Sequence, residues 1–428
     1  MGRVYFVIDM KSFFASVECS LMGLDPLTTK LVVADKERGE TTICLAVSPA
    51  LKELGVKNRC RLNEIPKDLD FIIACPQMQK YIDYAGKIYS IYLDYLSKDD
   101  IHVYSIDECF LDVTTFLKNH NMRAKAFALF LINRIQTELH VPATAGIGSN
   151  LYLAKIALDI EAKKSKDGIG WLDEAKFIKN LSNHRPITDF WRISRGTSNR
   201  LAKYGIYDME GIRSIDEEIL YKEFGIDAEL MIDHAYGKEL CLMKHIKQYK
   251  GKSKSISSSQ ILFKSYSISD AILVTKEMVQ AGCLDLAKAK LVTSSVLISY
   301  NYEDFSYTYA RINLTKKTNL FNQMIDEIIC ACEKVLDNKK KVRRIGYAFY
   351  NLFDDANESY DLFTDMNKVE KEKKLRDSIL KIQEKYGKNS LLKGLDFMDN
   401  ATQRERNEMI GGHRGAKRTS EDVTRKPS

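Results

Sequence analysis

Three acidic residues occupy positions from which they could bind divalent cations. Asp107 and Glu108 are adjacent within the run 102–113, which otherwise has the pattern of two β-strands. Adjacent side chains of a strand point to opposite faces, but a tight turn allows two carboxylates to converge. A strand over 4–8 ends next to a third acid, Asp9. Three carboxylates at the tips of two apolar strands suit two cations for phosphoryl transfer, with substrate phosphates completing the coordination.

The length and composition predict a globular protein of several domains. The chain has 428 residues, of which 45% are hydrophobic, so about two to four domains are expected. The sequence contains no apolar run long enough for a membrane span, and no secretory signal is predicted. The nine cysteines lack C-x-x-C spacing, which favours reduced thiols in a cytoplasmic protein over zinc binding or a disulfide framework.

The elements that must position the acids form an α+β pattern in the first 167 residues. A helix begins near Ser12, a candidate N-cap, and further helices are predicted over 81–95, 122–138 and from Asn150 onward. Strands are predicted at 4–9, 31–34, 42–47, 102–113 and 143–147. We therefore expect a central antiparallel sheet backed by helices, in a split β-α-β layout.

The remainder of the chain has a different organisation. Residues 168–240 have the pattern of short helices, and the stretch 241–259 lacks acids and has the composition of a basic, flexible linker. Strands at 294–300, 306–312 and 344–349 indicate a second α+β domain. The charged C-terminal region contains one predicted amphipathic helix with Leu375, Ile379, Ile382 and Tyr386 on its apolar face, and disorder is expected from about Gly411.

Three segments resemble, in order and spacing, the motifs of Y-family translesion DNA polymerases of the UmuC/DinB type. They are 3–18, 104–112 with its Ser-Ile-Asp-Glu core, and 145–157. The likeness covers roughly residues 3–350 and is greatest to the bacterial UmuC-like branch, particularly its UvrX-type members. It implies an α+β multidomain right hand: palm at 1–19 and 77–167, small fingers at 20–76, helical thumb at 168–240, basic linker at 241–259, α+β little finger at 260–353, and charged tail at 354–428.

The resemblance implies a two-metal centre. Asp9, Asp107, Glu108 and the backbone carbonyl of Met10 would bind two Mg²⁺ ions, which would activate the primer 3′-hydroxyl and hold the triphosphate. Asp107 and Glu108 alone are also compatible with a solvated turn. Asp9 and the other motifs argue against that alternative.

Four side chains match nucleotide-binding positions of the family. Phe14 matches the steric gate that excludes a ribose 2′-hydroxyl, with Phe13 beside it, and burial in the first helix is the alternative for both rings. Lys155, off the apolar stripe of its helix, matches the phosphate-binding lysine, with a solvated lysine as the alternative. Pro49 and Lys52 stand where many members have tyrosine and arginine. Lys52 can contact phosphate as a point charge, and the UmuC-like branch also tends to have lysine there.

Other segments resemble the family's DNA-contacting surfaces, for which a solvated charged face is the bland alternative. In the helix-hairpin-helix-like stretch 189–206, Arg192 and Ser194 replace two hairpin glycines, which puts close backbone approach to phosphates in doubt. Side-chain contacts can substitute for that approach. The residues expected to contact DNA are Arg192, Arg195, Lys203, Lys252, Lys254, Arg343 and Arg344.

Residues 359–363, Ser-Tyr-Asp-Leu-Phe, resemble a sliding-clamp-binding peptide. Leu362 and Phe363 match its last two positions, whereas its first two positions differ. A local hydrophobic anchor is the alternative for these two side chains.

The sequence therefore predicts a template-directed, low-fidelity DNA polymerase that extends primers past damaged bases in DNA damage tolerance, repair and the SOS response. Its substrates would be primer–template DNA and deoxynucleoside triphosphates. A sliding clamp and other SOS or recombination proteins are candidate partners, and no membrane is involved. A catalytically silent DNA-binding or regulatory paralogue and a nucleotidyl cyclase are the alternatives. The intact acids and Lys155 argue against the first, and the basic linker and second domain argue against the second.

Overall fold

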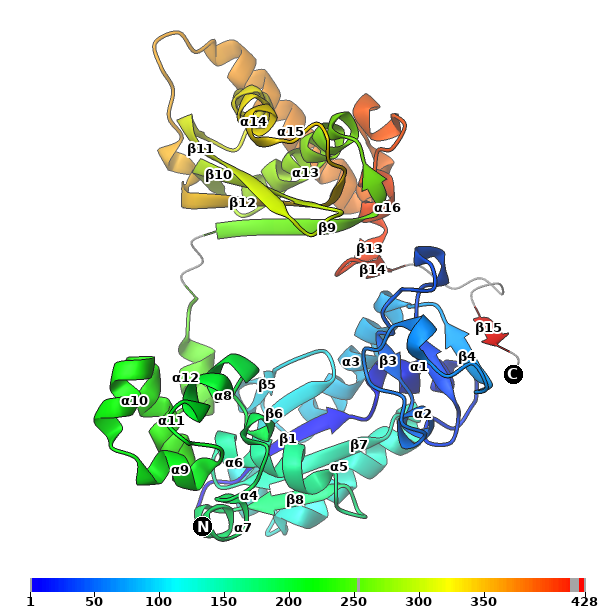
Figure 1. The fold of residues 1–428 in the computed structure, drawn as a ribbon, viewed down its shortest axis with the longest axis vertical. Helices are drawn as coiled ribbons and strands as arrows, with labels where there is room; N and C mark the ends of the chain where they lie inside the picture. Colours follow the sequence, from blue (N-terminus) through cyan, green and yellow to red (C-terminus); the bar gives the residue numbers. More distant parts are fainter. Residues whose placement is uncertain (1, 252–254, 416–422, 427–428) are drawn as a thin grey trace. The chain divides into compact units, whose positions relative to one another are not determined.

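The computed structural model describes residues 2–251, 255–415 and 423–426 (Figure 1). Lys252 and Lys254, two of the predicted DNA contacts, lie outside the described residues. The chain divides into two compact units, Met1–Lys250 with Lys417–Ser428, and Gly251–Ala416. We call them the catalytic unit and the C-terminal unit. Within the described residues, no helix is both long enough and apolar enough to cross a membrane.

The catalytic unit contains a five-stranded sheet in the order β5-β6-β1-β7-β8. The central strand β1 pairs antiparallel with both β6 and β7, as the α+β prediction requires. The edge strand β8 pairs in parallel with β7, so residues 169–172 are a strand and not part of a helical domain as predicted. The strands are β1 (Tyr5–Met10), β5 (Ile101–Val103), β6 (Glu108–Asp112), β7 (Ala143–Gly148) and β8 (Ile169–Leu172).

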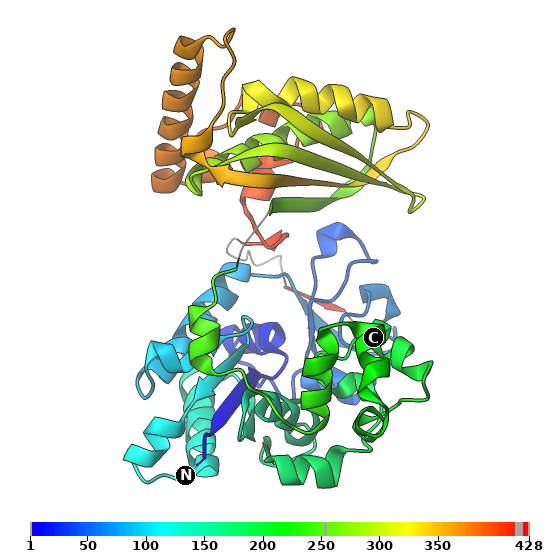
Figure 2. The same cartoon turned by 90° about the vertical axis from the view of Figure 1, so that its left-hand side faces the viewer.

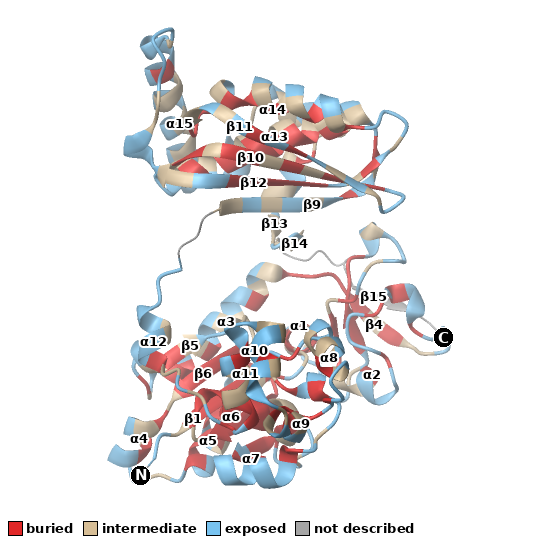
Figure 3. Cartoon of the chain, turned by 60° about the vertical axis from the view of Figure 1, so that its left-hand side comes forward, coloured by how far each residue is buried: buried red, intermediate tan, exposed pale blue. Residues whose placement is uncertain are grey.

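The alternation of side chains along β1 divides them between two faces. Phe6, Ile8 and Met10 are buried in the cluster that includes α1 (Phe13–Leu21), α3 (Met78–Leu93) and α5 (Ala124–Leu139). Tyr5 and Val7 are buried in another cluster with α6 (Leu151–Ile156), and the burial colours of Figure 3 show the sheet enclosed between these helices. Asp9, two residues beyond Val7, therefore belongs to the α6 face of the sheet.

Two glycines of β7 allow α6 to approach the sheet closely. A Cβ atom at Gly146 would lie 2.0 Å from the Ala154 carbonyl oxygen, and one at Gly148 would lie 2.2 Å from the Ala154 nitrogen. Asn150 caps α6 by accepting a hydrogen bond of 2.8 Å from the Leu153 N–H. The close packing of Ala154 positions the following residue of α6, Lys155, beside the sheet.

The fingers form a second sheet, in the order β15-β4-β2-β3, with α2 (Pro49–Glu53) nearby in sequence. The C-terminal strand β15 pairs antiparallel with the edge of β4, where unpaired backbone groups are available. A two-residue pairing also joins β13 to β14, so the prediction of disorder from Gly411 is wrong for the described residues. The strands of the fingers sheet are β2 (Leu31–Val33), β3 (Ala46–Val47), β4 (Phe71–Ala74) and β15 (Val423–Lys426), whereas the separate pair β13 (Met409–Ile410) and β14 (His413–Arg414) belongs to the C-terminal unit.

The thumb consists of short helices, as predicted for its residues beyond β8, and the core that they surround also includes Tyr152, Leu153 and Ile156 of α6. A further helix, α12 (Met243–Gln248), occupies part of the predicted flexible linker. Met243 is buried in the cluster that contains Tyr5 and Val7, because its apolar side chain covers the same face of the sheet as α6. The thumb helices are α7 (Glu174–Leu181), α8 (Arg195–Ala202), α9 (Met209–Ser214), α10 (Glu217–Phe224) and α11 (Asp227–Ala235).

The C-terminal unit contains the predicted second α+β domain, with a four-stranded antiparallel sheet in the order β11-β10-β12-β9 (Figure 2). Val296, Ile298 and Tyr300 of β10 point to the face on which α13 and α14 lie. The opposite face carries no helix of this domain. Its elements are β9 (Ser255–Tyr266), α13 (Ile268–Lys288), β10 (Leu291–Tyr302), β11 (Tyr307–Thr318), α14 (Phe321–Val335) and β12 (Val342–Asp354).

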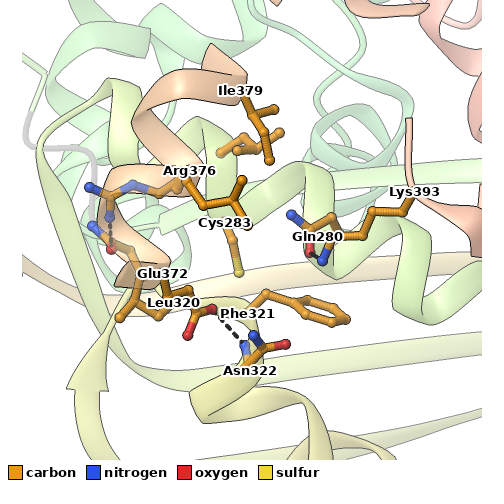
Figure 4. A pocket seen from close by; sticks show the side chains of 12 residues that line it. Gln280, Cys283, Leu320, Phe321, Asn322, Glu372, Arg376, Ile379 and Lys393 are labelled. Atoms are coloured by element: carbon orange, nitrogen blue, oxygen red, sulfur yellow. Dashed lines mark hydrogen bonds between the residues drawn. The ribbon is translucent and has the colours of Figure 1, made fainter. Parts of the chain in front are cut away.

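The last part of the C-terminal unit, residues 366–407, packs on α13. Figure 4 shows α15 (Met366–Tyr386) beside a cavity of about 50 Å³, with Glu372 accepting a hydrogen bond of 3.2 Å from the Asn322 N–H. The helix was predicted correctly, but its apolar face was not, since Leu375 and Tyr386 are exposed. The buried Glu277 of α13 accepts backbone hydrogen bonds at the start of α16 (Gln403–Asn407). The region predicted as a charged tail is therefore an ordered extension of the C-terminal unit.

Candidate active site

The pairing of β1 with β6 places Asp9 directly opposite Glu108. Asp107 lies in the preceding turn, where its Oδ1 accepts a hydrogen bond of 2.6 Å from the Ser105 hydroxyl. The Asp107 carbonyl accepts a hydrogen bond of 3.0 Å from the Met10 N–H. The structure thus brings all four predicted metal-binding residues to one end of the central strand pair.

Burial and mutual repulsion make this cluster electrostatically costly without a cation. Burial, with added repulsion from Asp107 and Glu108, raises the pKa of Asp9 to about 7. Burial also raises the pKa of Glu108, an effect that Lys155 opposes. Among the described residues, no three His, Cys, Asp or Glu side chains are arranged to enclose a metal ion by themselves. The oxygen-only donor set suits Mg²⁺, which commonly takes its remaining ligands from substrate phosphates and water.

Lys155 is buried against these acids and is not a solvated surface lysine. Its Nζ lies 2.8 Å from Oε1 and 2.9 Å from Oε2 of Glu108, and 3.1 Å from Oδ2 of Asp159. Burial works to lower the pKa of Lys155, but Glu108 and Asp159 together raise it, so the ammonium stays charged. The sequence reasoning missed Asp159, although an i, i+4 spacing from Lys155 was available as a signal.

Lys52 reaches the same site from the fingers. Its Nζ donates a hydrogen bond of 2.8 Å to the Ser12 hydroxyl, and Asp9 partly offsets the lowering of its pKa by burial. Ser12 is the N-cap of α1, as predicted, but at a φ of 48° it makes no side-chain capping bond, and its hydroxyl instead accepts the hydrogen bond from Lys52. Pro49 is the first residue of α2, where a missing N–H costs no hydrogen bond.

The two predicted nucleotide-binding rings have different environments. Phe13 is 3% exposed and belongs to the palm core, which agrees with the alternative interpretation that this ring is a buried core residue. Phe14 is only partly buried and stacks on Tyr81, with ring centroids 4.5 Å apart and planes at 21°. The Tyr81 hydroxyl donates a hydrogen bond of 2.7 Å to Glu18. Sequence reasoning identified neither Tyr81 nor Glu18 as part of the site, because only the fold brings α3 against α1.

The hairpin of the thumb keeps a glycine-like backbone without glycine. Arg192 has a φ of 71°, in the left-handed region that glycine ordinarily occupies, and its guanidinium lies 5.0 Å from the centre of the Trp191 ring. Ser194 caps α8, its hydroxyl accepting a hydrogen bond of 3.2 Å from the Thr197 N–H. Arg195 and Lys203 are exposed at the two ends of this helix.

The helix-free face of the C-terminal sheet is formed by aligned rows of residues from all four strands. Arg344 lies in one row with Tyr307, and Arg311 lies four residues further along β11, two rows away on the same face. The Arg344 guanidinium donates a hydrogen bond of 2.9 Å to the Ser259 hydroxyl, and that of Arg343 donates one to the Leu262 carbonyl. None of the residues in these rows is acidic: they are Ser255, Ser257, Ser259, Ile261, Ser295, Leu297, Ser299, Asn301, Tyr307, Tyr309, Arg311, Asn313, Arg344, Gly346, Ala348 and Tyr350.

The candidate clamp-binding residues are presented to solvent. Leu362 is 100% exposed and Phe363 is 95% exposed, which contradicts the alternative that they form a local hydrophobic anchor. The turn around them is held in place, since Asp361 forms an ion pair of 2.9 Å with Lys316 and accepts a hydrogen bond of 3.0 Å from the Phe363 N–H.

Comparison with known proteins identifies the class. The impB/mucB/samB family matches residues 8–159, and the C-terminal domain of the same family matches residues 253–362. The chain belongs to this family and is a Y-family DNA polymerase of the UmuC/DinB type.

The individual relatives agree with this class. UvrX of Bacillus subtilis (strain 168), whose name assigns it to UV-damage repair, is 32% identical over 95% of this chain and 96% of its own length. DNA polymerase IV 2 of the same strain is 28% identical over 96% of this chain and 98% of its own length. A Y-family DNA polymerase chimera of Dbh and Dpo4 has the same fold, with a TM-score of 0.65, 21% identity, and coverage of 82% of this chain and 99% of that chain.

Proposed function

We propose that this protein is a translesion DNA polymerase that extends a primer by two-metal-ion nucleotidyl transfer with low fidelity. The observation that carries the proposal is the pair of the partly buried Asp9 and the buried Glu108 on adjacent strands, with Asp107 in the turn beside them and Lys155 bound to Glu108. Metal-ion pairs in such sites stabilise both the attacking and the leaving oxygens of an in-line displacement. We place this activity in the cytoplasm and in the SOS response.

The residues of the chain divide the work. Asp9, Asp107 and Glu108, with the Met10 carbonyl, would hold two Mg²⁺ ions. Lys155, which pairs with Glu108, would supply positive charge to the triphosphate. Lys52 is held near Asp9 by Ser12 and would supply a second positive charge to the phosphates. The ring of Phe14 would meet the incoming sugar.

Primer extension with Mg²⁺ tests the proposal. We expect wild-type protein to extend a primer on an undamaged and on a lesion-containing template, and Asp107→Ala/Glu108→Ala to lose at least about a thousandfold of that rate. Asp99→Ala, which removes an exposed acid of the same unit, is the matched control and should keep the wild-type rate. Cyclic nucleotide formation in place of extension would identify a cyclase. DNA binding with neither reaction would identify a silent paralogue.

We also propose that the helix-free face of the C-terminal sheet contacts the DNA backbone. Arg311 and Arg344 give this face positive charge, and the small residues Ser257 and Ser259 of β9 and Gly346 and Ala348 of β12 leave room there for a phosphate backbone to approach. The exposed Arg195 and Lys203 of the thumb, with Arg192, are further candidate contacts.

A sliding clamp is the partner that we propose for residues 359–363. Two adjacent, fully exposed apolar side chains on an anchored turn are suited to insertion into an apolar pocket. Leu362→Ala/Phe363→Ala should abolish capture of the protein by immobilised bacterial clamp while leaving extension without clamp unchanged. Leu375→Ala, at another exposed apolar residue of this unit, should retain capture. Equal capture of the double variant and wild type would reject this partner.

A further inference from the structure

A buried carboxylate lies behind the ring of Phe14. Glu18 of α1 is fully buried, and its two carboxylate oxygens accept hydrogen bonds of 3.2 Å from the Gln77 side-chain amide. One of them also accepts the hydrogen bond of 2.7 Å from the Tyr81 hydroxyl. A carboxylate in a core is costly unless such donors satisfy it, and an apolar residue would avoid that cost. A function that needs a fixed geometry would explain why this position carries a carboxylate.

The hydrogen bond fixes the ring on which Phe14 rests. Tyr81 is fully buried, and burial raises its pKa well above the ordinary value, so the hydroxyl keeps its proton and donates it to Glu18. The Tyr81 ring is stacked on Phe14, and Phe13 contacts both rings at steeper angles, with centroids 6.5 Å from Tyr81 and 5.8 Å from Phe14. Phe14 therefore has a rigid ring on one side.

The network also connects two helices that are distant in sequence. Phe14 and Glu18 lie one turn apart on α1, whereas Tyr81 lies on α3, 63 residues from Glu18. The hydrogen bond sets the position of the Tyr81 ring relative to α1, and the stacked rings transmit that position to Phe14. An aromatic ring is otherwise broadly free in its second torsion angle, because that rotation has no sharp staggered minima.

We propose that Glu18 is a positioning residue for sugar selection: it holds the Tyr81 hydroxyl, and the stacked Tyr81 ring sets the plane of Phe14. The inference rests on the proposed function of Phe14 as the group that excludes a 2′-hydroxyl. To exclude a ribose 2′-hydroxyl by steric repulsion, the Phe14 ring must be placed accurately. Displacement of a positioned group by about 1 Å is enough to change reaction rates a hundredfold. Glu18 and Tyr81 would act only through Phe14 and would not touch the nucleotide.

The test compares incorporation of deoxyribonucleotides and ribonucleotides by three single variants. Tyr81→Phe keeps the stacked ring and removes its hydrogen bond to Glu18, and Glu18→Gln weakens the same bond from the other side. For both variants we expect the ratio of kcat/KM for a deoxynucleotide to that for the matching ribonucleotide to fall about three- to tenfold. Tyr152→Phe is the matched control, because Tyr152 is also fully buried but its hydroxyl has no hydrogen-bond partner among the described residues. Its ratio should equal that of wild type.

Thermal unfolding of the same variants separates positioning from stability. A lower melting temperature with an unchanged sugar ratio in both Tyr81→Phe and Glu18→Gln would show that the network is structural only, and would overturn the inference. A wild-type protein that extends no primer would instead refute the proposed polymerase function. If one variant does not fold, the other decides the question, because each breaks the same hydrogen bond from a different residue.

Discussion

The catalytic unit and the C-terminal unit use charge in opposite ways on similar sheets. In the catalytic unit, Glu108 of the sheet and Lys155 of α6 form a buried ion pair beside the partly buried Asp9. In the C-terminal unit, Arg311 and Arg344 lie on the face that no helix of the α+β domain covers. For the roles proposed above, the comparison teaches that catalysis and DNA binding require different environments. Groups that stabilise developing charge act most strongly when desolvated and fixed, whereas charges that track a DNA backbone act from the solvated surface and are screened by salt.

This contrast predicts effects of different size and kind. A change among the buried groups should alter the rate of the chemical step at saturating DNA. A change on the helix-free face should alter DNA affinity and its salt dependence, and should leave the chemical step unchanged.

After the loss of the acids themselves, the largest effect is expected at Lys155. Lys155→Met removes the cation from a buried carboxylate, so Glu108 loses its partner and the triphosphate loses a positive charge. We expect kcat/KM for the incoming nucleotide to fall about a hundredfold or more in single-nucleotide primer extension. Lys163→Met is the control, because Lys163 is exposed and lies 3.8 Å from the same Asp159; it should change the rate less than about twofold. Equal losses in the two variants would remove the distinction between buried and exposed charge.

A smaller and more selective effect is expected at Phe14. Phe14→Ala removes the proposed obstacle to a 2′-hydroxyl, so the preference for deoxynucleotides should fall roughly ten- to a hundredfold. Phe6→Leu provides the comparison, because Phe6 is fully buried in the palm core and its ring packs on Phe127. It should lower the free energy of unfolding by about 1 kcal/mol in urea denaturation and keep the sugar preference. Ribonucleotide discrimination that survives Phe14→Ala would reject the gate.

The sequence was most predictive where chemistry restricts residue type. Asp9 and the Asp107-Glu108 pair could be placed from strand patterns. Few residue types supply the oxygen ligands that Mg²⁺ prefers, and side chains alternate along a strand with a period of only two residues. The glycines of β7 were present in the third motif, but their reason is the close packing of α6, since a Cβ atom at Gly146 would lie only 2.0 Å from the Ala154 carbonyl oxygen. Spacing alone contains no information on that distance.

The elements that were missed depend on contacts between distant segments. The lysine-rich composition of residues 241–259 predicted a flexible linker and concealed α12. Only one residue of this helix, Met243, is buried, and it packs in a cluster with residues of β1. The strand β8 belongs to a sheet whose other strands all lie earlier in the sequence, the last of them ending about twenty residues before β8 begins. The Glu18–Tyr81 pair spans 63 residues and has no local signature. Local patterns identify an element, whereas the partner that stabilises it is set by the fold.

The smallest effect on chemistry, and the clearest test of the contrast, is expected on the helix-free face of the C-terminal sheet. Arg311→Ala/Arg344→Ala should weaken DNA binding about tenfold at moderate salt, and should reduce the magnitude of the slope of log K against log salt concentration by about two, because each arginine would neutralise one phosphate. Lys288→Ala/Lys334→Ala removes the same charge from exposed positions on α13 and α14. That pair should change the slope far less, since it lies on the helical side of the domain. Fluorescence anisotropy at several salt concentrations measures both slopes, and single-turnover extension at saturating DNA should give one rate for both double variants. Equal slopes would mean that net charge, and not this face, carries the affinity.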